Sequence, residues 1–381
     1  MRFSGFGVSA LGLALLAGSA HAGGFSRGTA DTDILYEEGN FNLRAGATVV
    51  TPSQKFSRNP GGTTSGGVVG TDYLDTYVIP TAAVKFKVTD NLSCAGTFTT
   101  PYGANSSHPS PYGPSGKLSE EFTVSEFGGT CAVFFDMGRG RLSVLGGAFV
   151  EKFDYELSAL PTLPSPPAPF PGPAPLGIEL GSNAYGWRAG LGYEIPEIAL
   201  RAQLMYRSGT SHDATGSATL YGMPLGTATG SGELPQSVEF KLQTGVAPGW
   251  LAFGSVKWTD WSVNERLVVS AGPITSANLY HWKDGWTVTG GVGHAFNERV
   301  SGLVSLQWDQ GVSNGYDFRS DKWMLATGVS LKDDLGGELR LGGALVYLTS
   351  DEITGAGAPD FGAAVDSGWA GILSANYKVR W

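Results

Sequence analysis

Segments in which apolar and polar residues alternate are joined along this chain by connections that switch regularly between short and long. The last segment runs to the terminus, and one of its faces carries Trp369, Gly371, Leu373, Ala375, Tyr377, Val379 and Trp381. Its other face carries Ser374, Asn376, Lys378 and Arg380. A half-buried strand of a soluble protein alternates in the same way, but here the pattern recurs along the chain and ends on an aromatic residue. We therefore predict an all-β fold, a closed antiparallel transmembrane β-barrel of a bacterial outer membrane, with one strand face toward lipid and the other toward a polar interior.

Residues 1–22 have the pattern of an export signal. Arg2 precedes an apolar run over 6–17, and the small residues Ala20 and Ala22 follow it. A basic start, a short apolar run and small residues at the cleavage point are typical of a signal peptide. The run is shorter than the ~20 residues of a membrane-spanning helix. We expect cleavage after Ala22 and export of the remaining chain.

The alternation predicts fourteen strands, an even number as in single-chain bacterial barrels. The predicted strands are 41–51, 77–88, 92–100, 119–135, 141–157, 184–195, 198–209, 235–247, 250–262, 284–296, 299–309, 322–332, 338–349 and 368–381. Short turns rich in Asn, Asp, Gly and Pro are expected at the periplasmic side. The long connections, expected outside the cell, are 52–76, 101–118, 158–183, 210–234, 263–283, 310–321 and 350–367. The barrel domain is thus predicted over 41–381.

The charges of the chain constrain its partners. With 34 acidic and 25 basic residues, the formal net charge is −9 at pH 7. A surface of this sign repels the phosphates of nucleic acid, so we expect no nucleic-acid partner. The expected surroundings are outer-membrane lipid and lipopolysaccharide.

On the predicted strands, charged residues fall on one face only. Arg188 and Glu194, for example, alternate with Trp187 and Leu191. Because a charge facing lipid near the midplane costs about 2–4 kcal/mol, the charged face should line the lumen. Five basic residues of that face are candidates for binding a carboxylate headgroup: Arg188, Arg201, Lys241, Lys257 and Arg340. The alternative is that they pair with the lumenal carboxylates of Glu194, Glu239 and Glu338 and brace the barrel.

The segment 23–40, which precedes the first strand, does not alternate. Because it begins at the periplasmic side, it either hangs free or folds back into the barrel. A fourteen-stranded lumen is wide enough to need filling or to leave a water channel. Phe25, Ile34, Leu35 and Tyr36 give the segment apolar surface to bury. We predict that 23–40 is a lumenal plug.

The external connection 158–183 is nearly uncharged, apolar and rich in proline. Proline stiffens such a segment toward an extended conformation, which displays apolar side chains without collapse. The side chains available for contact with a hydrophobic ligand are Leu160, Leu163, Phe170, Leu176 and Ile178. A binding surface for a hydrophobic molecule and a rigid spacer that touches lipopolysaccharide both fit this composition.

The two cysteines, Cys94 and Cys131, fall on neighbouring predicted strands, both on the outward face. An oxidising compartment permits a disulfide between them. Two separate small apolar side chains are the other interpretation, because the geometry decides and the sequence does not supply it.

Several stretches resemble the FadL/TodX (OMPP1) family of outer-membrane transporters for long-chain fatty acids and aromatic hydrocarbons. The strand pair 186–195 and 199–208 is similar to that family's pair around a short periplasmic turn, and 234–239, 248–250 and 258–262 are similar to its next two strands. The start at 23–25 and the sequence Pro101-Tyr102-Gly103 also resemble family motifs. The similarity spans nearly the whole mature chain.

The resemblance implies a fourteen-stranded barrel closed by an N-terminal hatch. It further implies that external loops capture a hydrophobic molecule, that an interior pocket touched by Phe25 receives it, and that it leaves sideways at a kink near Pro101–Gly103. One departure is that the family's Asn-Pro-Ala hatch motif is missing, because the chain's Asn59-Pro60 comes after the first strand. The hatch is therefore expected to be reduced.

Catalysis finds little support in the sequence. No Ser-His-acid set converges in the strand map, and the acidic residues of the last long connection match no calcium loop. We expect no enzyme activity, no metal and no cofactor.

The predicted function is passive uptake of hydrophobic compounds, with long-chain fatty acids or related hydrocarbons as the small-molecule partner and a monomer as the working unit. The alternatives are a general diffusion porin for small polar solutes and a structural or adhesive barrel. Charged lumen walls suit a porin equally well, whereas the apolar connection 158–183 and the segment 23–40 favour uptake of hydrophobic compounds.

Overall fold

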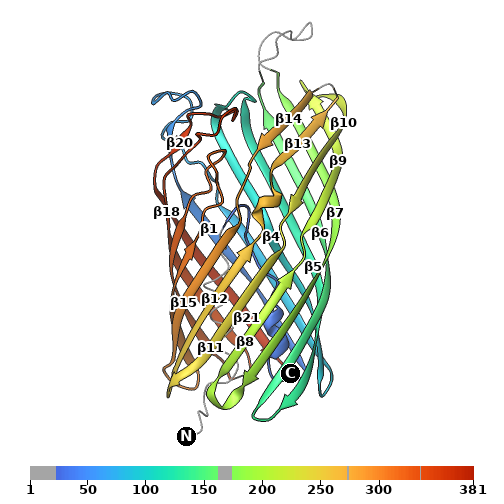
Figure 1. The fold of residues 1–381 in the computed structure, drawn as a ribbon, viewed down its shortest axis with the longest axis vertical. Coiled ribbons are helices and arrows are strands. Elements are labelled where there is room, and N and C mark those ends of the chain that lie inside the picture. The colour runs from blue at the N-terminus through green and yellow to red at the C-terminus, as the bar shows by residue number, and fades with distance from the viewer. Residues whose placement is uncertain (1–22, 162–173, 273, 335) are drawn as a thin grey trace.

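A computed structural model describes residues 23–161, 174–272, 274–334 and 336–381. Within them, eighteen strands form one antiparallel sheet that closes on itself (Figure 1). The closure is made by β1 (Phe41–Ser53), which pairs with β21 (Gly368–Arg380) on one side and with β3 (Tyr77–Thr89) on the other. The predicted signal peptide, residues 1–22, lies outside the described residues.

Fourteen of these strands form the wall of the barrel, as predicted. Besides β1, β3 and β21 they are β4 (Leu92–Tyr112), β5 (Lys117–Met137), β6 (Gly140–Ala159), β7 (Leu176–Ile195), β8 (Leu200–Arg207), β11 (Ser237–Ala247), β12 (Trp250–Thr259), β15 (Gly285–Ala295), β16 (Val300–Asp309), β17 (Lys322–Lys332) and β18 (Glu338–Leu348). Each pairs with its neighbours in antiparallel register, so the wall closes on itself. This satisfies the backbone polar groups that lipid does not solvate.

The prediction of long loops was wrong in part, because several of these connections continue the wall. β4 runs through Tyr112 and β5 starts at Lys117, so the predicted loop 101–118 is mostly strand. Four further strands extend the sheet at the same end: β9 (Thr210–Leu220), β10 (Met223–Leu234), β13 (Arg266–Ala271) and β14 (Ile274–Leu279). Beyond the lipid the backbone still needs hydrogen bonds, but outward side chains no longer have to be apolar, so the alternation fades. A small separate sheet of β2 (Phe56–Arg58), β19 (Asp351–Glu352) and β20 (Ala364–Val365) lies among the connections (Figure 1).

The predicted inward and outward faces are confirmed. Trp187 and Leu373 are 53% and 72% exposed on the outside of the wall, whereas Arg188 and Lys378 on the opposite face are buried. Outside a membrane such large exposed apolar side chains would have no partner, so this surface is the lipid-facing band.

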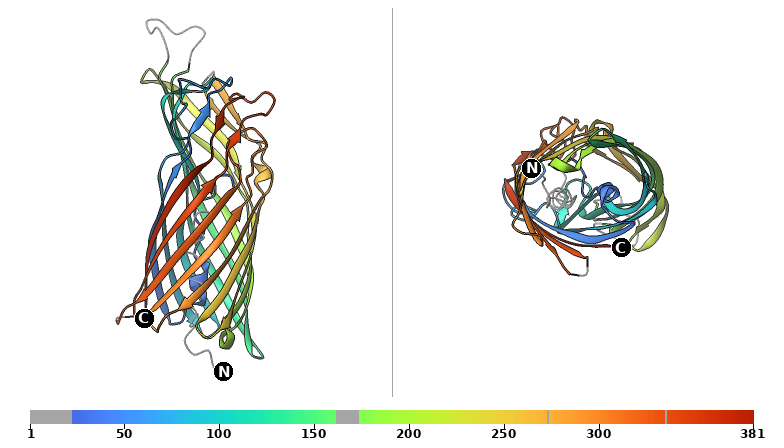
Figure 2. Two further views of the ribbon diagram at one scale, coloured as in Figure 1. Left: turned by 90° about the vertical axis from the view of Figure 1, so that its left-hand side faces the viewer. Right: turned by 90° about the horizontal axis from the view of Figure 1, so that it is seen from below.

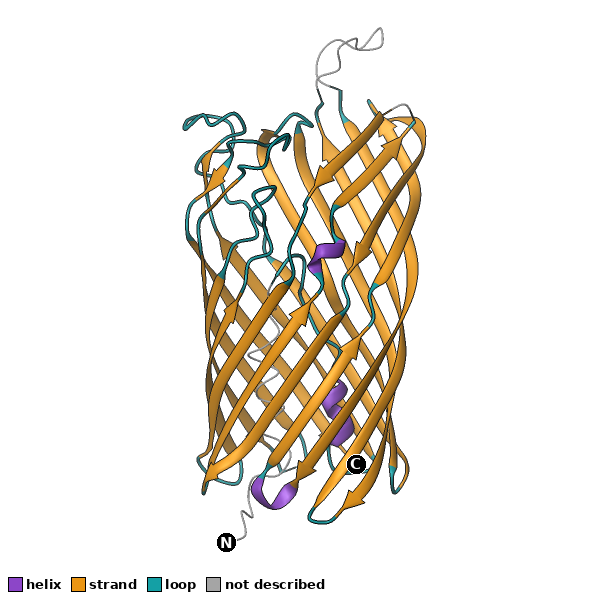
Figure 3. Ribbon diagram, in the orientation of Figure 1, coloured by secondary structure: helices purple, strands orange, loops and turns teal. Residues whose placement is uncertain are grey.

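The segment 23–40 lies inside the barrel. Its 3-10 helix η1 (Thr32–Tyr36) contacts β3, β4 and β5 from within, and the view from the short-turn end shows it inside the ring of strands (Figures 2 and 3). Ile34, Leu35 and Tyr36 are at most 2% exposed. The apolar residues of this segment are therefore buried against the wall.

Ion pairs also attach this segment to the wall. Asp31 lies 2.6 Å from Arg44. Asp33 lies 3.2 Å from Lys241. The carboxylate of Glu37 is 2.6 Å from Arg44, 3.0 Å from Lys378 and 3.6 Å from Arg340. Each acidic residue of 31–37 thus meets a cation of a wall strand, which fixes the position of the segment.

The structure resolves the question of the cysteines. Cys94 on β4 and Cys131 on β5 are directly opposite in the strand register, with Cα atoms 4.0 Å apart, and form a disulfide. The bond joins the two strands on the outer face of the wall.

Among the described residues, no helix has both the length and the apolar character to cross a membrane.

Candidate functional site

A cavity of about 390 Å³ lies inside the barrel, between the long connections and Phe25. This volume is within the range of about 300–1,000 Å³ that is usual for small-molecule sites. Its wall is contributed by β4, β5, β6, β7, β9, β10, β13 and β14 and by the connection between β16 and β17. The lining includes nine aromatic side chains: Phe25, Tyr73, Tyr112, Phe122, Phe153, Tyr155, Tyr280, Tyr316 and Phe318.

Phe25 packs in a group of aromatic rings at one end of this cavity. Its ring centroid lies 4.7 Å from those of Phe122 and Trp282 and 5.6 Å from that of Tyr280. Preceding it, Gly24 has φ +51°, and a Cβ there would approach the indole of Trp261 to 2.7 Å. A residue without a side chain therefore allows the chain to pass close to the ring. The N-terminal segment positions an aromatic surface at the cavity.

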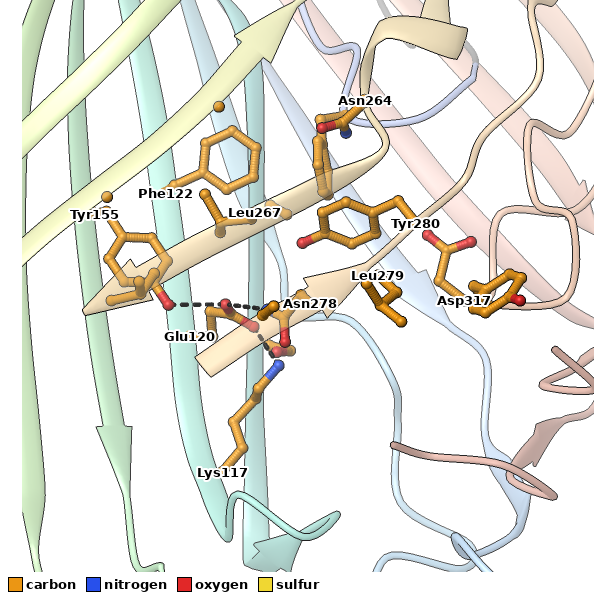
Figure 4. A pocket seen from close by; sticks show the side chains of 18 of the residues that line it. Lys117, Glu120, Phe122, Tyr155, Asn264, Leu267, Asn278, Leu279, Tyr280 and Asp317 are labelled. Atoms are coloured by element: carbon orange, nitrogen blue, oxygen red, sulfur yellow. Dashed lines mark hydrogen bonds and ion pairs between the residues drawn. The ribbon is translucent and has the colours of Figure 1, made fainter. Parts of the chain in front are cut away.

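A polar cluster lies next to Tyr155 at the wall of the same cavity (Figure 4). Glu120 on β5 forms an ion pair with Lys117, accepts a hydrogen bond from the Tyr155 hydroxyl at 2.9 Å and lies 3.4 Å from the Asn278 amide. The charges of Lys117 and Glu120 are matched within the cluster. This side of the cavity is polar but internally satisfied.

The connection between β16 and β17 brings a second polar pair, Asp317 and Arg319, to the cavity. The Trp282 indole N–H donates a hydrogen bond to Asp317 at 2.9 Å. Burial raises the pKa of Asp317 to about 6, although the nearby Arg319 opposes the shift. Arg319 lies with its guanidinium carbon 5.2 Å from the Phe25 ring centroid.

A smaller cavity of about 60 Å³ lies on the other side of the N-terminal segment. Ser26, Gly28 and Thr32 contribute to its wall, together with Tyr102 and Glu126. Residues 23–28 therefore separate two internal spaces, because Phe25 lines one and Ser26 lines the other.

The five predicted basic residues all lie on the inner face of the wall, and the large cavity is not lined by any of them. Arg201 is 3.3 Å from Glu194, and Arg340 is 2.7 Å from Glu338. Lys241 pairs with Asp33 and lies 3.7 Å from Glu239, and Arg188 pairs with Glu126. Three of the five, Arg188, Lys241 and Lys257, line the small cavity. Arg201, Lys241 and Arg340 thus lie near the carboxylates that the alternative interpretation named, whereas the partner of Arg188 is Glu126.

Lys257 differs from the other four. Within the described part of the chain it has no carboxylate within 4.0 Å, although Glu239 is its partner in the strand register. Of the predicted residues it is the one whose charge faces the small cavity without an ion pair.

Of the apolar candidates from 158–183, the three that the structure describes, Leu160, Leu176 and Ile178, do not line the large cavity. Leu176 and Ile178 start β7 and are buried among Leu180, Ala218 and Ala228, and it is Leu180 that reaches the cavity. Leu160 follows the end of β6, where its N–H donates to the Gly116 carbonyl at 2.7 Å. Leu163 and Phe170 lie outside the described residues.

The wall is interrupted beside the large cavity. β3 and β4 pair up to Thr81 and Thr99, and Tyr77–Pro80 of β3 lack a β4 partner in the described register. There β4 has a bulge between Thr99 and Tyr102. Residues 25–28 pair with β4 from inside, since Arg27 N–H donates to the Pro101 carbonyl at 2.8 Å and Gly103 N–H to the Phe25 carbonyl at 3.0 Å. The irregularity lies where the family resemblance implied a kink.

One sequence prediction about chemistry was wrong. Ser182 on β7 and His212 on β9 are 3.0 Å apart (Oγ to Nδ1), and His212 Nε2 is 3.3 Å from a Glu151 oxygen, so a Ser-His-acid set does converge. Its serine does not line the large cavity, and Glu151 also pairs with Arg207. These strands use their backbone N–H groups in the sheet, where an oxyanion site would need free donors.

No cluster of His, Cys, Asp and Glu suited to a metal ion is found in the described ranges.

The cavity residues that the sequence analysis missed share one property. Lys117, Glu120, Tyr280, Asp317 and Arg319 lie at or beyond the ends of the predicted strands, where no periodicity assigns a direction to a side chain. The only available signal was composition, an aromatic and charged mixture in 276–283 and 316–322.

A closed barrel with a lipid-facing wall and an aromatic internal cavity is characteristic of outer-membrane transport proteins. A family model described as outer membrane protein transport protein (OMPP1/FadL/TodX) matches residues 34–310, more than half of the chain. The chain belongs to this family of the bacterial outer membrane, as the sequence resemblance indicated. No curated protein matches the chain.

Solved structures of the same architecture accompany this match. A Pseudomonas aeruginosa FadL homologue is 13% identical with a TM-score of 0.74, covering 98% of this chain and 97% of its own. The Ralstonia pickettii toluene transporter TbuX is 15% identical with a TM-score of 0.66, covering 100% and 99%. The monoaromatic hydrocarbon channel CymD is 14% identical with a TM-score of 0.66, covering 99% and 94%. At such identities the likeness concerns the fold, the closed fourteen-stranded barrel.

Proposed function

We propose that this protein mediates passive uptake of hydrophobic compounds, long-chain fatty acids or related hydrocarbons, across the outer membrane. The observation that carries the proposal is the aromatic cavity that ends on Phe25 inside the barrel. The toluene transporter TbuX and the monoaromatic hydrocarbon channel CymD, which share the fold, support a hydrophobic cargo.

Binding in this cavity would draw its free energy from removal of apolar ligand surface from water. At about 25 cal/mol per Å², burying roughly 200 Å² of an acyl chain contributes about 5 kcal/mol. A binding free energy of this size is favourable but still allows the ligand to dissociate. The process needs no covalent chemistry and no energy source, and a monomer suffices, because cavity and wall belong to one chain.

The segment 23–40 acts in this proposal as a hatch. Its position inside the lumen and the ion pairs of Asp31, Asp33 and Glu37 support that role. A hatch distinguishes an uptake channel for hydrophobic compounds from a general porin, in which the lumen stays open to polar solutes.

The exit lies, in this proposal, at the interruption between β3 and β4. The large cavity is lined there by Leu74, which precedes β3, and by Ala104 and Asn105 of β4. A hydrophobic ligand leaving at this place enters the lipid directly and avoids the charged residues toward the periplasm.

The first capture step is assigned to the connection 158–183. The sequence of this connection is nearly uncharged, apolar and rich in proline, a composition that suits contact with a hydrophobic ligand. This step rests on composition and stays a prediction.

Single-channel conductance in a planar bilayer tests the proposal. The intact protein should be nearly silent, and deletion of 23–40 should raise the conductance greatly. A large, steady conductance of the intact protein that dodecanoate leaves unchanged would indicate a general porin. If deletion prevents folding, the variant Ser26→Cys tests the same point in the intact protein. A hatch that closes the lumen should protect this cysteine from a membrane-impermeant thiol reagent.

A further inference from the structure

The disulfide between Cys94 and Cys131 lies on the lipid-facing surface of the wall, between two groups of apolar side chains. Toward the external end of the same face lie Phe98 and Phe127, whose ring centroids are 4.9 Å apart. Toward the periplasmic turns, β5 continues on this face with the exposed ring of Phe135. The disulfide is therefore inside the lipid band rather than beyond either edge of it.

The outward side chains around the disulfide carry no charge. On the two bonded strands and their neighbours they are Leu92, Gly96 and Phe98 on β4, Gly129, Val133 and Phe135 on β5, Phe86 on β3 and Gly146 on β6. In the membrane the two sulfur atoms thus face hydrocarbon, and none of these neighbours offers a polar group to a reagent.

Thiol–disulfide exchange is disfavoured in such surroundings. The attacking species is a thiolate, and creating an unpaired charge in hydrocarbon is unfavourable. The reaction also requires access of the oxidant to the sulfur atoms, and soluble disulfides are polar molecules that lipid excludes. The two cysteines therefore have to react while water still surrounds them.

The order of the strands allows the disulfide to form at that stage. β4 and β5 are consecutive, the connection 113–116 joins them, and the cysteines lie at the open end of this hairpin. A sequence separation of 37 makes the closure a local event that involves no other strand. The register of the hairpin alone brings the two Cα atoms to 4.0 Å.

We propose that Cys94 and Cys131 are oxidised in the periplasm before the barrel enters the membrane, by exchange with a soluble disulfide-bearing oxidant. The thiolate of one cysteine attacks the disulfide of the oxidant and forms a mixed disulfide, from which the second thiolate displaces the oxidant. The chain loses two protons and two electrons and gains one S–S bond, and the disulfide of the oxidant becomes two thiols. After insertion, lipid protects the bond from reductants. This order of events does not depend on the cargo of the channel.

Oxidation of the reduced protein in two states tests the proposal. The full chain is exposed to oxidised glutathione either unfolded in urea or folded in lipid nanodiscs, which leave both faces of the membrane accessible. Free thiols are then counted by alkylation after denaturation. Oxidation in nanodiscs should be at least about tenfold slower than in urea, because lipid denies access to the sulfur atoms. Equal rates, or failure of the unfolded chain to form the disulfide, would overturn the proposal.

The matched control moves the cysteine pair along the same two strands. In a Cys94→Ser, Cys131→Ser background, Ser107→Cys and Ser119→Cys place two thiols opposite each other on β4 and β5, near the external tip of the hairpin. Because water reaches this position, the control pair should be oxidised readily in nanodiscs. Slow oxidation of both pairs would show that the folded wall rather than lipid limits the reaction, and it would overturn the proposal.

A measurement on the oxidised protein covers the case in which the reduced chain does not fold. In nanodiscs, the charged reductant tris(2-carboxyethyl)phosphine should reduce the disulfide between Cys94 and Cys131 at least about tenfold more slowly than the disulfide of the control pair. Equally fast reduction of the two bonds would mean that reagents in water reach the sulfur atoms after insertion. That result would remove the reason for oxidation before insertion and overturn the proposal.

Discussion

The guanidinium carbon of Arg27 lies 4.1 Å from the centroid of the Tyr77 ring. Arg27 Nη2 also donates a hydrogen bond to Oδ1 of Asn105 at 2.7 Å. Tyr77 belongs to β3 and Asn105 to β4, so one side chain of the N-terminal segment connects the two strands where their pairing is interrupted. Arg27 therefore covers the proposed exit from the inside.

We expect Arg27→Ala to accelerate release of bound ligand by about tenfold, because loss of a stacked, hydrogen-bonded side chain removes about 1–2 kcal/mol from the closed state. Stopped-flow fluorescence of a bound fatty-acid probe measures this rate. Gly103→Val should act in the same direction, since a Cβ at Gly103 would lie 2.8 Å from the Arg27 guanidinium carbon. Arg58→Ala is the control, because its ion pair with Glu352 lies among the external connections. An unchanged release rate in both test variants would contradict a gating role.

Glu37→Gln should loosen the N-terminal segment. It withdraws one carboxylate from Arg44, Lys378 and Arg340, and breaking a buried charge cluster costs about 3–5 kcal/mol. We expect a lower urea midpoint and frequent channel openings in a planar bilayer. The neighbouring Glu38→Gln should have little effect, because Glu38 is largely exposed and 3.4 Å from Arg380. Similar behaviour of the two variants would contradict an anchoring role for Glu37.

Asp317 and Asp351 should make the external connections more resistant to protease as the pH falls from 7 to 5. Burial raises the pKa of Asp317 and of Asp351 to about 6, so the folded connections bind more protons than the unfolded ones. Stability is then gained as the pH falls through about 6 and lost as it rises through the same window. Limited proteolysis in vesicles at both pH values measures this. Burial also lowers the pKa of His108 to about 4, which acts in the opposite direction, so the aspartate effect is read as the difference between two proteins. The double variant Asp317→Asn, Asp351→Asn should gain less resistance between pH 7 and 5 than the intact protein, and an equal response of the two proteins would contradict the role of these aspartates.

Reduction of the Cys94–Cys131 disulfide should lower the unfolding free energy. The bond closes a chain segment with a sequence separation of 37, for which the chain-entropy model gives about 4 kcal/mol. Urea unfolding with and without reductant measures the change. The double variant Cys94→Ser, Cys131→Ser should have the urea midpoint of the reduced protein, and reductant should not change that midpoint. Equal midpoints for the oxidised and reduced protein would show that strand pairing alone holds β4 to β5.

Phe25→Ala should weaken binding of dodecan-1-ol, because the ring is part of the apolar wall of the cavity. Loss of a large apolar contact corresponds to about 1.5–3 kcal/mol, or more than tenfold in affinity. Tryptophan fluorescence titration measures it. Phe361→Ala removes an exposed ring that does not line the cavity, and it should bind normally.

The membrane-spanning part of this fold was predictable because lipid imposes a simple rule. Leu373 has to face lipid and Lys378 has to avoid it, so the sequence of each strand records the direction of its side chains. The burial of Ile34 to Tyr36 was predictable for a similar reason, because an apolar cluster in the segment before the first strand is stable only when other apolar side chains cover it. The disulfide was left open, because only the register between β4 and β5 places Cys94 opposite Cys131.

The cavity was not predictable in the same way. Lys117 at the start of β5 and Tyr280 and Arg319 on two connections line the same cavity although they are far apart in the sequence. Neither lipid nor a strand period constrains the directions of these side chains. The alternation of the strands predicts ligand cations at Arg188 and Arg340, which the structure shows in ion pairs with Glu126 and Glu338. A charged residue in an alternating strand predicts that its side chain points into the lumen. The strand pattern does not predict which oppositely charged side chain lies beside it.

The pairing of β1 with β21 also determines how this barrel is built. The two strands come from opposite ends of the barrel sequence, and Asn42 lies opposite Arg380 in their register. Until the last strand arrives, β1 and β18 each present a row of unpaired N–H and C=O groups, which lipid does not solvate. Insertion is therefore coupled to ring closure, and a chain stalled before residue 368 would remain a substrate for chaperones and proteases, however well its first thirteen wall strands pair.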